Sequence, residues 1–299
     1  MDPEMHMSRL IKLSNKVYPQ SCPNLPISIL WQSSRRGDAN NRNAAFSFLF
    51  VLAFSLVAGF ALSAEEDTTG FAETFRHLSR DRWFISDGWT NGDYQSCEWR
   101  ADAISTAEND MRLTLSDRGG KIRPIGCPEI RTKSRLGYGL YEARIRSASG
   151  SGLNTAFFTY TGPPTGSAEH DEIDFEFLGK DPQTVNINHF TNGKPYDGKI
   201  IQLGFDASKT FHNYGFEWMI DRIRWYVDET LVSETPAGAK IPRNPGHLFF
   251  SLWSGSNLED AWMGPFHYSV PAIADVAWFA YTPPGASCKF PESMKCKAK

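Results

Sequence analysis

The segment HDEIDFEF at positions 170–177 alternates acidic and apolar residues with a period of two. On a β-strand, successive side chains point to opposite faces, so the acids share one face and the apolar residues share the other. The apolar face requires a core, whereas like charges side by side destabilise the surface of a sheet. The segment therefore predicts a strand with one buried face and one acidic face, the latter formed by Glu172, Asp174 and Glu176.

Three interpretations of this acidic face are open. An exposed edge strand can carry acids that discourage aggregation, and a group of carboxylates can bind a divalent cation. A pair of carboxylates is also the machinery of glycoside hydrolysis. Asp and Glu are poor strand formers, so three of them in one strand favour a chemical use, and the neighbouring residues strengthen that interpretation.

The rest of the chain favours a β-rich fold of short strands separated by turns. Its 299 residues are 13% aromatic and include 24 Gly and 18 Pro, and we find no amphipathic helix of three turns and no internal repeat. Many antiparallel strands with alternating faces predict two packed sheets, as in a sandwich or jelly roll. The expected strands include 111–115, 138–146, 153–160, 216–220, 223–227, 248–253 and 276–281.

The first part of the chain is typical of an export leader. Residues 44–61 are almost wholly apolar, follow several arginines and precede small residues that end at Ala64. We expect cleavage near Ala64 and a secreted or periplasmic protein. An uncleaved membrane anchor is the alternative, because about 18 apolar residues nearly span a bilayer. The expected division of the chain is a leader over 1–64, one domain over 65–282 and a tail over 283–299.

The charge distribution argues against a nucleic-acid partner. The net charge is −3, and the leader contains more basic than acidic residues, so the remainder is more acidic still. Nucleic-acid binding requires clustered basic residues, and none are present. We expect a polysaccharide partner instead, with no stable membrane association after cleavage and a monomeric state.

Four cysteines lie beyond the leader: Cys97, Cys127, Cys288 and Cys296. Four cysteines allow three pairings. The short spacing in the tail makes Cys288–Cys296 plausible, which leaves Cys97–Cys127. A zinc site is the alternative, but neither pair has CxxC spacing and no cluster of histidines accompanies them.

Aromatic and polar residues in several segments could converge on the acidic face, where pyranose rings would stack and hydroxyls would hydrogen-bond. Any single Trp can instead be a core residue, and Trp218 and Trp225, at alternating positions of an expected hairpin, are best explained as core. His170 and His189 flank the acids and are interpreted as hydrogen-bonding or subsite residues rather than metal ligands. The residues that could converge in this way are Trp89, Asn91, Glu129, Arg131, Phe158, Asn188, Trp253 and Trp262.

The motif EIDFE at 172–176 matches the signature of family 16 of the glycoside hydrolases, and the chain resembles the bacterial lichenases, which are endo-β-1,3-1,4-glucanases. Within that group it is similar to rhizobial glycanases that trim the exopolysaccharide succinoglycan. The resemblance covers about 70–282. Further similar motifs are GYGLYE at 137–142, FTYTGP at 158–163, FLGKD at 177–181, LGFDAS at 203–208 and WYVD at 225–228.

The resemblance implies an all-β, concanavalin-like jelly roll of two antiparallel sheets and a retaining double displacement. It implies that Glu172 is the nucleophile, Glu176 the general acid/base and Asp174 the carboxylate between them. It also implies a Cys97–Cys127 disulfide, and it implies that the eight converging residues given above, from Trp89 to Trp262, are glycan contacts. Transglycosylation is an alternative outcome of the same chemistry, and a glycan-binding lectin on the same fold is an alternative of another class.

The chain departs from the lichenase pattern at several positions. Phe190 replaces a usual Tyr, Ser251 replaces a usual Asn and Trp89 replaces a Tyr. Many relatives bind a structural calcium through an Asp near the last strand, where this chain has Ala277, with Asp275 two residues earlier. No cofactor is expected to be required for catalysis, and a structural calcium ion is left open.

Overall fold

The computed structural model describes residues 69–297 except 109, 163 and 289. The predicted export leader therefore lies outside the described residues. Within them, no helix has the length and apolar character that a membrane span requires.

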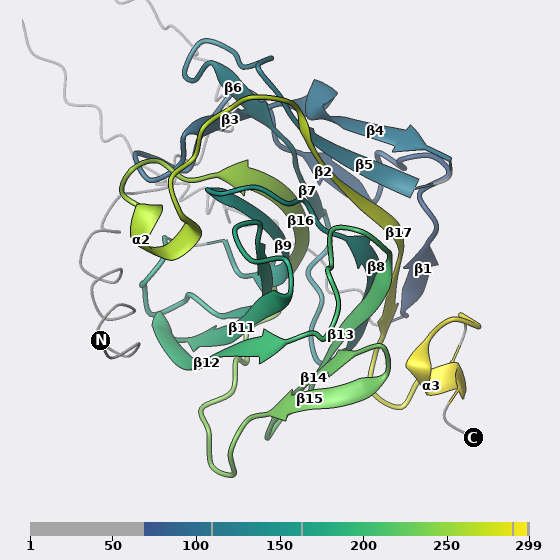
Figure 1. Ribbon diagram of the computed structural model, residues 1–299. Helices are drawn as coiled ribbons and strands as arrows, with labels where there is room; N and C mark the ends of the chain where they lie inside the picture. The colour runs from purple at the N-terminus through teal and green to yellow at the C-terminus, as the bar shows by residue number, and fades with distance from the viewer. Residues whose placement is uncertain (1–68, 109, 163, 289, 298–299) are drawn as a thin grey trace, which may run out of the picture. The chain divides into compact units, whose positions relative to one another are not determined.

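The described chain forms two large antiparallel β-sheets. In Figure 1 the strands of each sheet follow one another around a curve. This is the predicted all-β sandwich. The eight-stranded sheet has the spatial order β15 (Thr230–Glu234), β14 (Ile223–Val227), β13 (His212–Trp218), β8 (Gly139–Arg146), β17 (Ala272–Thr282), β5 (Asp110–Leu115) and β4 (Ile104–Ala107), with β1 (Phe71–Glu73) beside β17. The seven-stranded sheet has the order β12 (Lys194–Gln202), β11 (Thr184–Thr191), β10 (Glu172–Leu178), β9 (Leu153–Tyr160), β16 (His247–Ser254), β7 (Glu129–Thr132) and β2 (Trp83–Ile85).

Smaller elements connect or flank the sheets. A short parallel pair is formed by β3 (Cys97–Trp99) and β6 (Ile125–Cys127). The helices in the described part are one-turn segments: η1 (Ala101–Ala103), α2 (Asp260–Met263) and α3 (Met294–Lys297). In β3 and β6, the Cα atoms of Cys97 and Cys127 lie 5.8 Å apart, and those of Cys288 and Cys296 in the tail lie 5.2 Å apart, both within the span of a disulfide.

The core lies between the two sheets and is rich in aromatic rings. Phe157 of β9 is fully buried and stacks on Phe175 of β10 and Phe250 of β16, both in its own sheet. Across the interface it contacts Phe216 of β13 and Phe279 of β17, with centroids 5.4 and 6.2 Å away. Such offset aromatic packing stabilises a core beyond the burial of area alone. The inward side chains of both sheets thus meet at this ring.

Strand β10 has the two faces that its sequence predicts. Ile173, Phe175 and Phe177 are at most 1% exposed and face the core. The strand lies between β9 and β11, inside the seven-stranded sheet. The interpretation of the acids as a protected edge is therefore wrong, because β10 has no free edge.

The predicted hairpin at 216–227 is confirmed, with one change in its turn. Trp218 and Trp225 are 2% and 1% exposed, as expected for core residues. The turn begins earlier than predicted, because Met219 N donates to Arg222 O and Ile220 is left 74% exposed. Trp225 also donates from Nε1 to the carbonyl oxygen of Asp174, 3.2 Å away. A core residue of one sheet thereby holds the backbone of β10 in the other.

Candidate active site

The acidic residues of β10 lie in three cross-strand rows on the face directed away from the core, which we call the acid face. Glu172 lies between Tyr160 of β9 and Phe190 of β11. Asp174 lies between Phe158 and Asn188. Residues directly opposite each other in neighbouring strands point to the same side, so strand register alone brings these side chains together.

The rows continue across β16 and β7. From Phe158 the middle row runs to Phe249 and then to Arg131. From Glu176 the third row runs through Ala156 and Ser251 to Glu129. Side chains from five strands therefore share the acid face, and they include the predicted residues Glu129, Arg131, Phe158 and Asn188.

Glu176 is set up to hold a proton at neutral pH. Burial, helped by the charges of Glu172 and Glu259, raises its pKa to about 8, although a hydrogen bond from Asn154 acts in the opposite direction. Asn154 Nδ2 donates to Oε1 of Glu176 over 2.9 Å. A buried carboxyl near like charges favours its neutral form. Glu176 can thus donate a proton at neutral pH.

Asp174 is the most enclosed of the three acids. It is 4% exposed, and its pKa is raised well above the ordinary value, chiefly by burial and then by the charges of Glu172 and Glu176. A hydrogen bond with Glu172 acts in the same direction. Because this bond favours the protonated form of Asp174, Asp174 is its donor and Glu172 its acceptor.

Glu172 is the more accessible partner and accepts a hydrogen bond from outside the acid triplet. Its side chain is 19% exposed, and its Oε2 lies 2.5 Å from Nε2 of His170. The acid face therefore combines Glu172, which is hydrogen-bonded by His170 and Asp174, with Glu176, whose pKa is raised to about 8.

Glu129 and Arg131 form a second polar group on the same face. Burial raises the pKa of Glu129 to about 7, although the Ser86 hydroxyl, which donates over 2.6 Å, and the charge of Arg131 oppose this. The Arg131 guanidinium lies over the ring of Phe84, 4.7 Å from its centroid. The pair can offer hydrogen bonds to sugar hydroxyls at the far side of the sheet.

The remaining predicted glycan contacts gather at one end of the acid face. Trp253 of β16 and Trp262 of α2 are partly exposed and lie 6.2 Å apart. The 89–96 loop lies beside the end of β16, since Ser96 N donates to Ser254 O. Within that loop the ring of Trp89 lies 6.2 Å from Trp99, whose Nε1 donates to Asn91 Oδ1. These side chains come from separate segments and could hold successive sugars.

The second predicted histidine has a different environment from the first. His189 is fully buried, and its Nε2 lies 2.9 Å from the carbonyl oxygen of Lys240. It pairs in register with Ile173, so it lies on the core side of the sheet. The interpretation as a hydrogen-bonding residue holds, but this position excludes His189 from the acid face.

Asn154 and Tyr160 were not among the predicted site residues. Asn154 lies in the apolar run of β9, which predicted burial alone, and Tyr160 stood out only as a member of the motif at 158–163. Asn154 Oδ1 and Asn188 Oδ1 are buried without a hydrogen-bond partner among the described residues. Polar atoms buried without partners are costly, so both carbonyl oxygens can be satisfied by the hydroxyl groups of a bound sugar.

The two positions at which a structural calcium ion was left open do not offer it a free side-chain oxygen. Both carboxylate oxygens of Asp275 accept hydrogen bonds from arginines, Oδ1 from Arg112 over 2.8 Å and Oδ2 from Arg146 over 2.6 Å. Ala277 supplies no side-chain oxygen. Within the described part of the chain, no group of three His, Cys, Asp or Glu side chains is placed to hold a metal ion.

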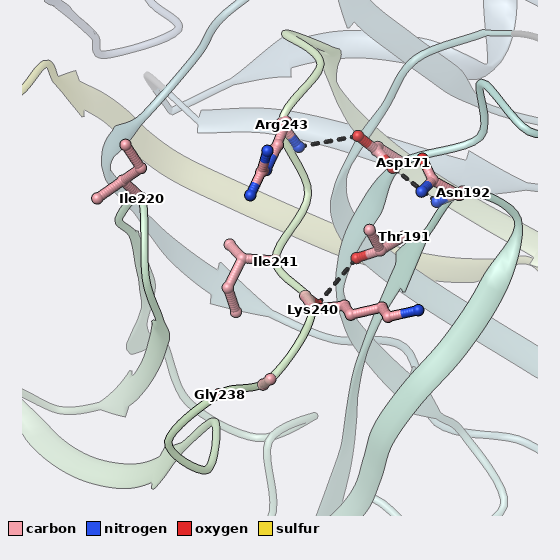
Figure 2. A pocket seen from close by; sticks show the side chains of 9 residues that line it. Asp171, Thr191, Asn192, Ile220, Gly238, Lys240, Ile241 and Arg243 are labelled. Atoms are coloured by element: carbon pink, nitrogen blue, oxygen red, sulfur yellow. Dashed lines mark hydrogen bonds between the residues drawn. The ribbon is translucent and has the colours of Figure 1, made fainter.

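A hollow of about 430 Å³ lies near the start of β10 but away from the acid face (Figure 2). Thr191 lines it and follows Phe190, which lies opposite Glu172, so Thr191 points to the other side of the sheet. The carboxylate of Asp171 also borders it, but accepts hydrogen bonds from the backbone of Asn192, Arg243 and Asn244. Asp171 therefore fastens loops together rather than joining the acid triplet.

The chain is similar in sequence and in fold to several known proteins. The family model of the glycosyl hydrolases family 16 matches residues 91–269. The endo-1,3-1,4-beta-glycanase ExoK of Rhizobium meliloti is 44% identical over 227 residues, which cover 76% of this chain and 84% of the relative. The beta-glucanase of Paenibacillus macerans is 39% identical over 81% of this chain and 98% of its own. The solved Bacillus licheniformis beta-glucanase superposes with a TM-score of 0.66 at 39% identity, covering 71% and 97% of the two chains.

Proposed function

The chain belongs to glycosyl hydrolases family 16 and is an endo-acting β-glycanase, and we propose that it cleaves by a retaining double displacement with Glu172 as nucleophile and Glu176 as general acid/base. The observation that carries this proposal is the difference between two carboxyl groups on one face. Glu176 has a pKa raised to about 8, whereas Glu172 accepts a hydrogen bond from the His170 ring. Opposed environments of this kind separate the acid from the nucleophile in glycosidases.

The proposed reaction has two steps. In the first, the Glu172 carboxylate forms a bond to the anomeric carbon, while the glycosidic oxygen leaves with the proton of Glu176. In the second, Glu176 removes a proton from water, whose oxygen attacks the anomeric carbon and releases Glu172. Asp174 donates a hydrogen bond to Glu172 and spreads the charge that the nucleophile gains on release. Two inversions retain the anomeric configuration.

The proposed substrate is a β-1,3-1,4-glucan or a related bacterial exopolysaccharide such as succinoglycan. The names of the relatives support the first, and the line of aromatic and polar residues on the acid face supports binding of several sugars. Parallel incubation with lichenan, laminarin and succinoglycan, followed by mass spectrometry of the products, identifies the substrate. Cleavage of laminarin alone would contradict the proposed linkage preference.

The catalytic roles are tested with matched amide variants. Glu172→Gln should abolish turnover, because the amide cannot attack. Glu176→Gln should lose activity on natural glycans but retain it on aryl glycosides with good leaving groups, and azide should accelerate it and yield a β-glycosyl azide. Glu142→Gln is the control, since Glu142 is buried at 3% exposure in β8 of the other sheet. Full activity of Glu172→Gln would refute its role as nucleophile.

The alternative activities predict different products. A transglycosylase would yield oligosaccharides longer than the substrate, and a lectin would bind glycan without releasing new reducing ends. We also propose that the enzyme binds no structural calcium ion at Asp275, since Arg112 and Arg146 already supply the positive partners of this carboxylate. EDTA should leave the rate and the melting temperature unchanged, and restoration of either by calcium after a loss would contradict this.

Export and a monomeric state complete the proposal. The apolar segment 44–61 supports secretion or transfer to the periplasm. Sequencing the N-terminus of protein recovered outside the cytoplasm should place the start near residue 65, whereas a mature chain that begins before residue 44 would exclude a cleaved leader. Sedimentation of the same sample should give the mass of a single chain.

A further inference from the structure

The ring of His170 is held beside Glu172 by aromatic packing on two sides and by a hydrogen bond at each of its nitrogens. The side chain is fully buried. It stacks on Phe190, with centroids 4.7 Å apart and planes at 24°, and meets Tyr160 edge-on at 5.2 Å. Phe190 and Tyr160 are the two residues that flank Glu172 in its cross-strand row. The row that positions Glu172 therefore also fixes the ring.

The hydrogen bonds of the ring determine which nitrogen carries the proton. The backbone N–H of Gly166 donates to Nδ1 over 3.0 Å. A backbone N–H can only donate, so Nδ1 must present its lone pair. The proton of the neutral ring is then on Nε2, which lies 2.5 Å from Oε2 of Glu172. A doubly protonated ring would set two N–H groups against each other at Nδ1.

The loop before β10 presents this amide by a local feature of the backbone. Gly166 has φ of +83°, a conformation that side chains other than glycine rarely adopt. The chain then turns back, since His170 N donates to Ser167 O over 3.1 Å, and Gly193 N from the β11–β12 turn donates to His170 O over 2.8 Å. The position of the ring is thus set by a built loop and not by the ring's own preference.

From this geometry we propose that His170 is a positioning residue for the reaction: as the neutral Nε2–H tautomer, fixed by Gly166, it donates to Oε2 of Glu172 and holds the nucleophile in its attacking orientation. The proposal rests on the proposed role of Glu172. The bond exists in the free enzyme and persists through the transfer of the sugar, because the glycosyl ester retains an acceptor oxygen. His170 does not exchange its proton in this scheme.

Two substitutions test the hydrogen bonds of the two ring nitrogens separately. In His170→Gln the amide nitrogen reaches about as far as Nε2 and can still donate to Glu172. In His170→Asn the shorter amide can replace only Nδ1, so it can accept from Gly166 but leaves Glu172 without its donor. His170→Phe keeps the aromatic packing and lacks both polar contacts. A purely structural role would rank Phe as the best replacement, whereas the proposal ranks Gln first.

The decisive measurement is the rate at which a 2-deoxy-2-fluoro oligoglucoside with a dinitrophenolate leaving group inactivates each protein. This probe measures attack by the nucleophile without help from the acid. Loss of a hydrogen bond to a charged group should slow attack by about 10- to 100-fold in His170→Asn and His170→Phe. His170→Gln should remain within about tenfold of the unsubstituted enzyme, and the dissociation constant for a product oligosaccharide should be unchanged in all three.

Two further readouts keep the proposal open to refutation even if a variant folds poorly. Nitrogen NMR of ¹⁵N-histidine-labelled enzyme should show one ring protonated at Nε2 and unprotonated at Nδ1, in a signal absent from the folded His170→Asn variant. Mass spectrometry of the inactivated enzyme locates the adduct. An adduct on a residue other than Glu172 would overturn the proposed function. An adduct on Glu172 with equal rates in all variants, or a ring protonated at Nδ1, would overturn only the role of His170.

Discussion

Removing the side-chain amide of Asn154, which hydrogen-bonds Glu176, should move the alkaline limit of activity to higher pH. Asn154 is fully buried, and its Nδ2 donates to Oε1 of Glu176. This bond favours the ionised carboxylate and opposes the effect of burial, and the two together leave the pKa of Glu176 raised to about 8. Asn154→Leu has a similar shape and no donor, so the pKa of Glu176 should rise further.

The size of the change follows from the strength of the bond. A hydrogen bond to a charged group contributes about 1.5–3 kcal/mol, and 1.36 kcal/mol corresponds to one pH unit. The full strength of the bond would move the alkaline limb of the pH–activity profile by about one to two pH units. Because the amide can also contact the protonated acid, the lower figure is the expected one. Activity requires protonated Glu176, so the limb moves upward and not downward.

The assay is kcat/KM against pH on an oligosaccharide whose leaving group needs protonation. An aryl glycoside with a very good leaving group is the control, since its cleavage does not depend on the acid. With that control the alkaline limb should be weak or absent in both proteins. An alkaline limb in Asn154→Leu at the same pH as in the parent, or at lower pH, would refute the assignment of Glu176 as the acid that Asn154 tunes.

Three further predictions concern stability. Glu176→Gln should stabilise the fold increasingly as pH rises from about 4.5 to about 8. Over this range Glu176 has lost its proton in the unfolded chain but retains it in the folded one, so the parent protein loses stability as pH rises and the amide variant does not. A gain in melting temperature that is independent of pH would contradict this. Replacing Cys97 and Cys127 by Ser should cost about 3–4 kcal/mol in urea unfolding, since the bridge closes a loop with a separation of 30 residues, and an unchanged midpoint would argue against it. Glu142→Ala should release the C-terminal tail, because the Glu142 carboxylate accepts hydrogen bonds from the Ser293 hydroxyl and from the backbone N–H of Met294. Hydrogen exchange should become faster in the tail alone, and activity should stay normal. Unchanged exchange would contradict this prediction.

The sequence was sufficient for features that depend on the geometry of a single strand. The period of two in β10 predicted which residues enter the core and which form the acid face, because alternation of side chains is a property of an extended backbone. The same reasoning identified Trp218 and Trp225 as core residues. The order of the strands, and the position of β10 inside a sheet and not at its edge, could not be read from local patterns.

The roles of the acids depended on contacts between distant segments. Asn154 lies 22 positions before Glu176 and appears in the sequence only as a polar residue in an apolar run. Its effect on Glu176 exists because β9 pairs with β10 in one register. The bond from Trp225 to the backbone of Asp174 likewise spans 51 positions and joins the two sheets. The sequence by itself determined which side chains could face a sugar, because that choice is local. Only the tertiary structure decided their proton affinities and their partners, because burial and hydrogen bonding arise when strands far apart in the chain come together.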